Sequence, residues 1–180
     1  MSSNEASSTI EIVPHDCAWT SIYERKRVAL EKALPRDLYV EVHHVGSTSI
    51  PSMPAKPIVD ILVLVENLER NRSIYIHRLE AIGYDYLDAE SKSYRLMFAY
   101  RDQGGQRTVH VHVGSKDTSL YTMLRFQELL RTDRQLRSSY VALKKELARR
   151  YLHDRKGYQE GKRAFILNAL ASSSASKDGA

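Results

Sequence analysis

A short run of small polar residues between two apolar segments carries the clearest indication of chemistry in this sequence. It spans residues 44–51, and its centre is Gly46 followed by Ser47, Thr48 and Ser49. A glycine lets the backbone approach a ligand closely because it has no Cβ, and hydroxyls can join backbone amides in binding phosphate oxygens. We therefore predict that this turn binds the phosphate of a substrate.

A single acid interrupts the apolar run that follows the turn. Asp60 lies within residues 58–65, and all the remaining residues of this run are Ile, Val or Leu. An ionised carboxylate inside a buried strand is costly unless a metal ion, a cation or hydrogen bonds compensate it. Asp60 is therefore predicted to lie at a catalytic or metal-binding site.

Two histidines alternate with valines in the segment Val109-His110-Val111-His112-Val113. Strand alternation places both imidazoles on one face, which is a common arrangement for binding one metal ion. The alternative is that both are half-buried strand residues whose ring nitrogens bond to backbone or tyrosine groups. The segment is a candidate metal-binding strand.

Two cations could neutralise a bound anion. Lys56 precedes a proline, which favours an extended loop that presents the side chain either to phosphate or to Asp60. Arg95 would suit bidentate contact with phosphate. The alternative for each is a solvated surface side chain. We predict that Lys56 is catalytic and phosphate-binding, and that Arg95 binds phosphate.

The spacing of apolar residues predicts the elements that must position these groups. Strands are expected at residues 39–45, 58–65, 94–100 and 107–113, the last two joined by the polar, glycine-containing turn 101–106. Helices are expected at residues 19–34, 68–82, 119–132, 135–151 and 158–170. Together these elements form an α+β layout.

The composition is typical of one globular domain. At 180 residues and 42% hydrophobic, the chain is long enough to bury a single core and too short for two ordinary domains. We expect this domain to span residues 11–170, with disordered segments at residues 1–10 and 171–180.

Neither a membrane span nor a secretory signal is predicted. The apolar run at residues 58–65 is far shorter than the ~20 residues that cross a bilayer, and no basic region followed by an apolar stretch stands at the N-terminus. The single cysteine, Cys17, excludes an intrachain disulfide. A reducing interior, and so the cytoplasm, is the default location.

The net charge of +5 does not by itself indicate nucleic-acid binding. Much of the excess lies in residues 131–150, where Arg and Lys are interspersed with acids, and such a pattern favours a solvated helix face over a nucleic-acid groove. The expected partner is instead a nucleotide or another phosphorylated small molecule. The pattern indicates no oligomeric state.

Four blocks of the sequence together resemble the GrpB-like family, a branch of the nucleotidyltransferase superfamily. These blocks are residues 13–19, residues 44–61, residues 110–113, and residues 140–144 with Tyr158 and Lys162. The resemblance extends over residues 11–170. It implies a nucleotidyltransferase-like mixed β-sheet flanked by helices, a C-terminal helical segment, and a strand bearing His110 beside the strand bearing Asp60.

The acids expected from this resemblance are incomplete. Leu62 stands where a second acid is expected, and the strand expected to carry a third acid offers histidine. Because Mg²⁺ prefers oxygen ligands, a single Asp supplies too few ligands for two Mg²⁺ ions. A single Zn²⁺, Mn²⁺ or Fe²⁺ bound by Asp60, His110 and His112 is the better match.

Three classes of function follow from these observations. The first, which we favour, is a nucleotidyltransferase-like protein that binds a nucleotide or phosphorylated small molecule, with or without metal-dependent transfer. The second is a metal-dependent enzyme of other chemistry that uses the Asp and His residues. The third is a non-catalytic binding or folding-assistance module, since members of the family resemble a domain fused to dephospho-coenzyme A kinase.

Overall fold

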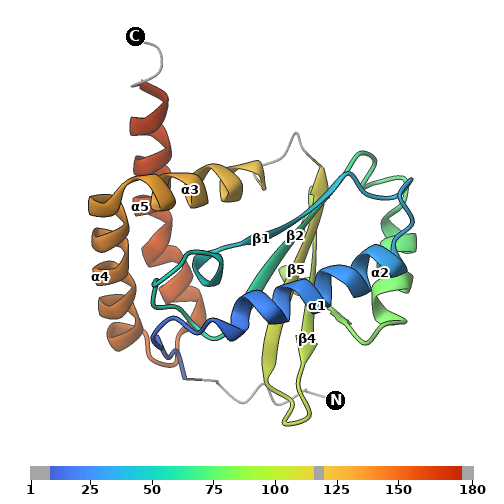
Figure 1. Cartoon of the computed structure of the whole chain (residues 1–180), viewed down its shortest axis with the longest axis horizontal. Coiled ribbons are helices and arrows are strands. Elements are labelled where there is room, and N and C mark those ends of the chain that lie inside the picture. The colour runs from blue at the N-terminus through green and yellow to red at the C-terminus, as the bar shows by residue number, and fades with distance from the viewer. Residues whose placement is uncertain (1–8, 116–119, 176–180) are drawn as a thin grey trace.

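The centre of the structure is a mixed sheet in which only one pair of neighbouring strands is parallel. The computed structural model describes residues 9–115 and 120–175 (Figure 1). Its strands lie in the order β1-β2-β5-β4-β3, and β2 pairs with β5 in parallel while the other pairs are antiparallel. The strands are β1 (Glu41–Val45), β2 (Val59–Val65), β3 (Asp85–Tyr86), β4 (Arg95–Arg101) and β5 (Arg107–Ser115).

The helices form two groups around this sheet. They are α1 (Ala18–Ala33), α2 (Arg72–Glu80), α3 (Tyr121–Thr132), α4 (Arg134–Arg150) and α5 (Arg155–Ala175). Figure 1 shows α3, α4 and α5 together on one side, with α1 crossing the strands and α2 beyond them. Within the described residues, no helix is both long and apolar enough to cross a membrane. The predicted α+β class, with a C-terminal helical segment, is confirmed.

The two faces of the sheet are covered by different helices because side chains alternate along β2. Ile61 and Val63 point into the main core, where α1 and α2 pack through Trp19, Leu30, Tyr75 and Leu79. Leu62 and Leu64 point the other way and pack with Leu120, Met123 and Leu124, at the start of α3. Asp60 has the same parity as Leu62. The acid therefore lies on the face that the C-terminal helices cover.

The structure departs from the expected boundaries at several places. The helix predicted at residues 68–82 begins at Arg72, and the short strand β3 was not predicted. Ile10, expected in a disordered segment, is buried, and its N–H donates to the Leu152 carbonyl at 2.9 Å. Residues 171–175 continue helix α5 instead of starting a disordered tail. The remaining terminal residues, 1–8 and 176–180, lie outside the described residues.

Candidate functional site

The predicted phosphate turn and Asp60 meet at the end of the β1–β2 pair. Gly46 has φ 72°, and the turn continues as a short 3₁₀ helix, η1 (Ser47–Ser49). The register pairs Val45 with Asp60. A Cβ built on Gly46 would lie 2.7 Å from Asp60 Oδ2. Only glycine therefore fits here, both for its positive φ and for the space that the carboxylate occupies.

The parallel pairing of β2 with β5 brings the two histidines to this acid. Asp60 is opposite His110, and Leu62 is opposite His112. Asp60 Oδ1 lies 3.3 Å from His110 Nδ1 and 3.6 Å from His112 Nε2. Burial raises the pKa of Asp60, but the favourable interaction of its carboxylate with the two nearby imidazoles outweighs burial and holds the pKa well below its usual range. The carboxylate is therefore ionised.

His112 is the less satisfied of the two histidines. It is 8% exposed, and both its ring nitrogens are buried without a hydrogen-bond partner. Burial lowers its pKa despite the nearby Asp60. His110 Nε2 lies 3.4 Å from the Arg155 guanidinium, which can only donate, so Nε2 accepts and Nδ1 carries the proton toward Asp60.

The fit of these three residues to a metal ion is mixed. The two separations from Asp60 Oδ1 are close to the edge of a tetrahedral site, about 3.3 Å for bonds of about 2.0 Å. The residues that the structure describes nevertheless contain no group of three or more His, Cys, Asp or Glu side chains placed to hold an ion. The carboxylate and imidazole donors suit a Zn²⁺-like ion, but the three side chains are not positioned as a complete coordination site.

Helix α4 contributes a lysine that sequence analysis did not place at the site. Lys144 is 2% exposed, and its Nζ donates to Ser47 Oγ at 3.0 Å and to the Pro54 carbonyl at 2.6 Å. Burial, followed by the charge of Lys162, lowers the pKa of Lys144 to about 7. A lysine between Tyr140 and Leu147 on the buried stripe of α4 was the signal that could have identified it.

Two further lysines interact electrostatically with Asp60, and Arg155 interacts with both of them. Lys162 of α5 lies over the Tyr158 ring, with Nζ 4.4 Å from its centroid, and Lys56 lies 5.9 Å from the same ring. Burial lowers the pKa of Lys162 to about 8 and that of Lys56 below its usual value, while the charge of Asp60 raises both. Arg155 is electrostatically coupled to both lysines. The catalytic and phosphate-binding roles predicted for Lys56 stay predictions, and Lys162 of α5 is a second lysine whose charge Asp60 favours.

The three hydroxyls of the turn have different hydrogen-bond partners. Ser49 Oγ donates to the Gly46 carbonyl at 2.7 Å and accepts from Gln127 Nε2 at 2.7 Å. Thr48 Oγ1 is 3.1 Å from His44 Nε2, and the His44 ring stacks on Tyr23. Burial lowers the pKa of His44 to about 4, so this ring is neutral at physiological pH. Ser47 is the hydroxyl that faces a lysine.

Arg95 does not join this group of contacts. It pairs in register with Gly114, two residues beyond His112 along β5, and its Nη2 donates to the Glu90 carbonyl at 3.1 Å. Its positive charge lowers the pKa of His112. The phosphate-binding role predicted for Arg95 therefore stays a prediction.

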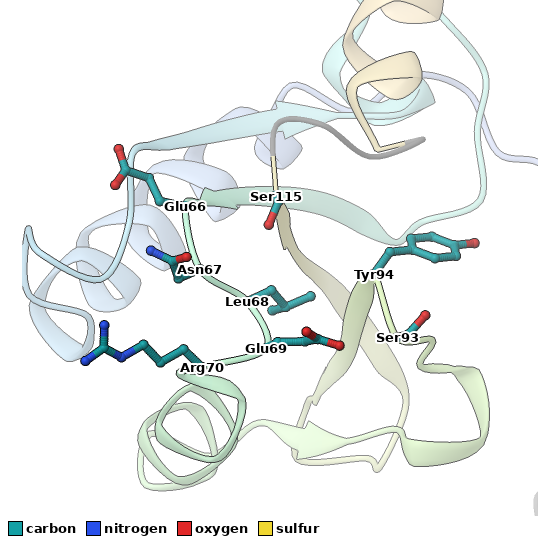
Figure 2. A pocket seen from close by; sticks show the side chains of 8 residues that line it. All are labelled: Glu66, Asn67, Leu68, Glu69, Arg70, Ser93, Tyr94 and Ser115. Atoms are coloured by element: carbon teal, nitrogen blue, oxygen red, sulfur yellow. The ribbon is translucent and has the colours of Figure 1, made fainter.

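A hollow of about 510 Å³ lies at the opposite ends of the same two strands (Figure 2). Its lining includes Ser115, which pairs with Val65, five residues beyond the Asp60 and His110 pair. At about 3.3 Å per residue the two places are about 16 Å apart. In Figure 2, Leu68 and Ser115 point into the hollow, whereas Arg70 points away. None of the predicted site residues lines it.

Comparison with known proteins shows the family to which the chain belongs. A sequence model of the family described as GrpB protein matches residues 9–172. A UPF0157 protein of Streptomyces coelicolor is 35% identical over 159 residues, which cover 88% of this chain and 81% of the relative. The crystal structure of the conserved protein GrpB from Enterococcus faecalis has a TM-score of 0.77 and 32% identity, and the match covers 90% of this chain and 96% of that one.

A more distant likeness concerns the fold alone. A crystal structure of the Cid1 poly(U) polymerase has a TM-score of 0.52 at 16% identity, over 77% of this chain and 43% of that chain. The chain belongs to the GrpB family, and its fold is similar to that of a nucleotidyltransferase.

Proposed function

We propose that this protein binds a nucleotide or a similar phosphorylated small molecule at the turn of residues 46–49. The observation that carries the proposal is a group of three lysines near the turn and Asp60, whose charged forms an anion would stabilise. Lys56, Lys144 and Lys162 are buried or half-buried, and none forms an ion pair with a carboxylate among the described residues. A bound phosphate would compensate this charge.

The surroundings of the turn support a phosphate more than a carboxylate ligand. Gly46 keeps the backbone close to Asp60, and Ser47 presents a hydroxyl beside Lys144. A phosphate group offers several oxygens, so it can accept from the hydroxyl and from more than one ammonium at once. The proposed substrate is therefore a compound with at least one exposed phosphate.

A thermal-shift screen of nucleoside mono-, di- and triphosphates tests this proposal. A ligand at 100 times its dissociation constant would add about 2.7 kcal/mol to the free energy of unfolding. The double variant Ser47→Ala/Lys56→Ala should lose this stabilisation, while Ser52→Gly/Lys145→Met, with both changes at exposed positions, should keep it. Undiminished stabilisation of the first variant would exclude the turn as the site, and no stabilisation of the wild type by any of these ligands would contradict the proposed nucleotide binding.

A second candidate function, metal-dependent chemistry, is favoured by the unpartnered nitrogens of His112. Asp60, His110 and His112 are the residues that would hold the ion, with Zn²⁺, Mn²⁺ or Fe²⁺ a better match than Mg²⁺. Such an ion would act as a Lewis acid toward a phosphoryl or carbonyl oxygen. Arg155, which lies at His110 Nε2, would orient this ring so that Nδ1, after losing its proton, faces the ion together with Asp60.

A further inference from the structure

We propose that Ser47 and Lys144 form a nucleophile and its general base, so that Ser47 accepts a phosphoryl group from the ligand bound at the turn. This inference rests on the proposed function for the identity of the donor. The inference goes beyond the proposed binding function because a serine that only binds phosphate needs no general base. The pairing of Ser47 Oγ with Lys144 Nζ at 3.0 Å is the geometry on which it stands.

Ser47 is the hydroxyl of the turn that is placed for this role. Thr48 is bonded to His44, and Ser49 is held between Gly46 and Gln127. Within the described residues, Lys144 is the side-chain partner of Ser47. Ser47 is also partly exposed, whereas Thr48 is buried. A ligand can therefore approach the Ser47 oxygen while the other two hydroxyls shape the turn.

Lys144 can serve as a base because its surroundings disfavour its charge. Its Nζ lies among the Ser47 hydroxyl, the Pro54 carbonyl, the Tyr140 ring at 5.2 Å and the charge of Lys162 from α5. Burial is the largest cause that lowers its pKa to about 7. A neutral amine can still donate to Pro54 while its lone pair accepts the Ser47 proton.

The transfer step balances without a further reactant. Ser47 Oγ attacks a phosphorus atom of a bound phosphoric anhydride, and the Oγ–P bond forms. The P–O bond to the leaving phosphate breaks, and the leaving oxygen keeps the electron pair. The Ser47 proton moves to Lys144 Nζ, and the positive charge there faces the developing negative charge on the phosphoryl oxygens.

Labelling with a fluorophosphonate probe, followed by intact-protein and peptide mass spectrometry, tests the pair without a nucleotide. We expect one adduct on Ser47, formed about tenfold faster at pH 8 than at pH 6 because Lys144 loses its proton in this range. Ser47→Ala should abolish the adduct. Lys144→Met should slow labelling and flatten its pH profile, while Lys145→Met, the exposed neighbour on the same helix, should not.

Circular dichroism on Lys144→Met shows whether the variant is folded. If it is not, the pH profile of labelling in the wild type still tests the pair. Absence of an adduct on Ser47 between pH 6 and 9, or equal rates for the wild type and a folded Lys144→Met, would overturn the pair. A second arm incubates the protein with a nucleoside di- or triphosphate that stabilises it, since these contain the phosphoric anhydride, and measures the mass of the protein. Stabilisation without a phosphoryl or nucleotidyl adduct on Ser47 would overturn the transfer step and leave the proposed binding function intact.

Discussion

Gly46 and Asp60 are fitted to one another: the position that a Cβ on Gly46 would occupy is 2.7 Å from Asp60 Oδ2. The turn and the acid belong to adjoining strands, and the Val45 and Asp60 pairing fixes their approach. The absence of a side chain at Gly46 is therefore a requirement of the site. It lets the carboxylate stand directly beneath the turn that we propose binds phosphate.

Gly46→Ala is predicted to destabilise the protein more than an alanine at another positive-φ glycine. Gly105 has φ 77°, and a Cβ added there would meet nothing within 4 Å, so Gly105→Ala measures backbone strain alone. We expect a loss of about 1 kcal/mol for Gly105→Ala and about 2 to 4 kcal/mol for Gly46→Ala. Urea unfolding monitored by circular dichroism measures both; equal losses would mean that the carboxylate moves away without cost.

Nucleotide affinity is predicted to fall as pH rises above about 7. The pKa values of Lys144 and Lys162 in the free protein are lowered to about 7 and about 8, so both lysines lose protons in this range. A bound phosphate favours the charged ammonium groups, so binding takes up protons. Calorimetry in two buffers of different ionisation enthalpy should detect this uptake near pH 8, and Lys144→Met should reduce it.

Without a ligand, stability is predicted to change with pH in the opposite sense. Unfolding returns Lys144 to its ordinary pKa of 10.5, so the unfolded chain binds more protons than the folded protein between about pH 7 and pH 10. The contribution of Lys144 to the free energy of unfolding therefore rises with pH across this window. Denaturant titrations at pH 7 and pH 9 should show a smaller rise in Lys144→Met than in the wild type.

Protein purified without chelator is predicted to carry Zn, Mn or Fe if the second candidate function holds. Elemental analysis of the wild type, Asp60→Asn and His112→Ala should then show loss of metal in both variants, because each removes a donor from the same group. His43→Ala is the control, since His43 is bonded to Glu41 at the sheet edge. Metal that survives both site changes would lie elsewhere, and a protein that binds no added metal would exclude this function.

Gln127 is predicted to stabilise the turn from helix α3. Its Nε2 donates to the His44 carbonyl at 3.0 Å and to Ser49 Oγ at 2.7 Å, and the residue is buried. Gln127→Ala should lower the free energy of unfolding by about 1 to 3 kcal/mol because it leaves buried acceptors without a donor. Glu128→Ala, at an exposed position, should have little effect, and thermal melting compares the two.

Local pattern was enough to predict the strand half of the site. The turn of residues 46–49 and Asp60 lie on either side of one short connection, so chain continuity brings them together. Alternation along residues 109–113 placed His110 and His112 on one face, and the family resemblance supplied the parallel neighbour of β2. The helices and the longer strands were predicted for the same reason, because apolar periodicity depends on residues that are close together in the chain.

The cationic half of the site was decided by tertiary packing. Lys144 is 97 residues from Ser47 in sequence, and Gln127 is 78 residues from Ser49. Which helical side chains reach the turn depends on how the layer of α3, α4 and α5 lies against the sheet, and apolar periodicity within each helix does not encode that placement. One sequence feature indicates this placement, namely the lysine on the buried stripe of α4. A buried charge there requires a polar partner from another element.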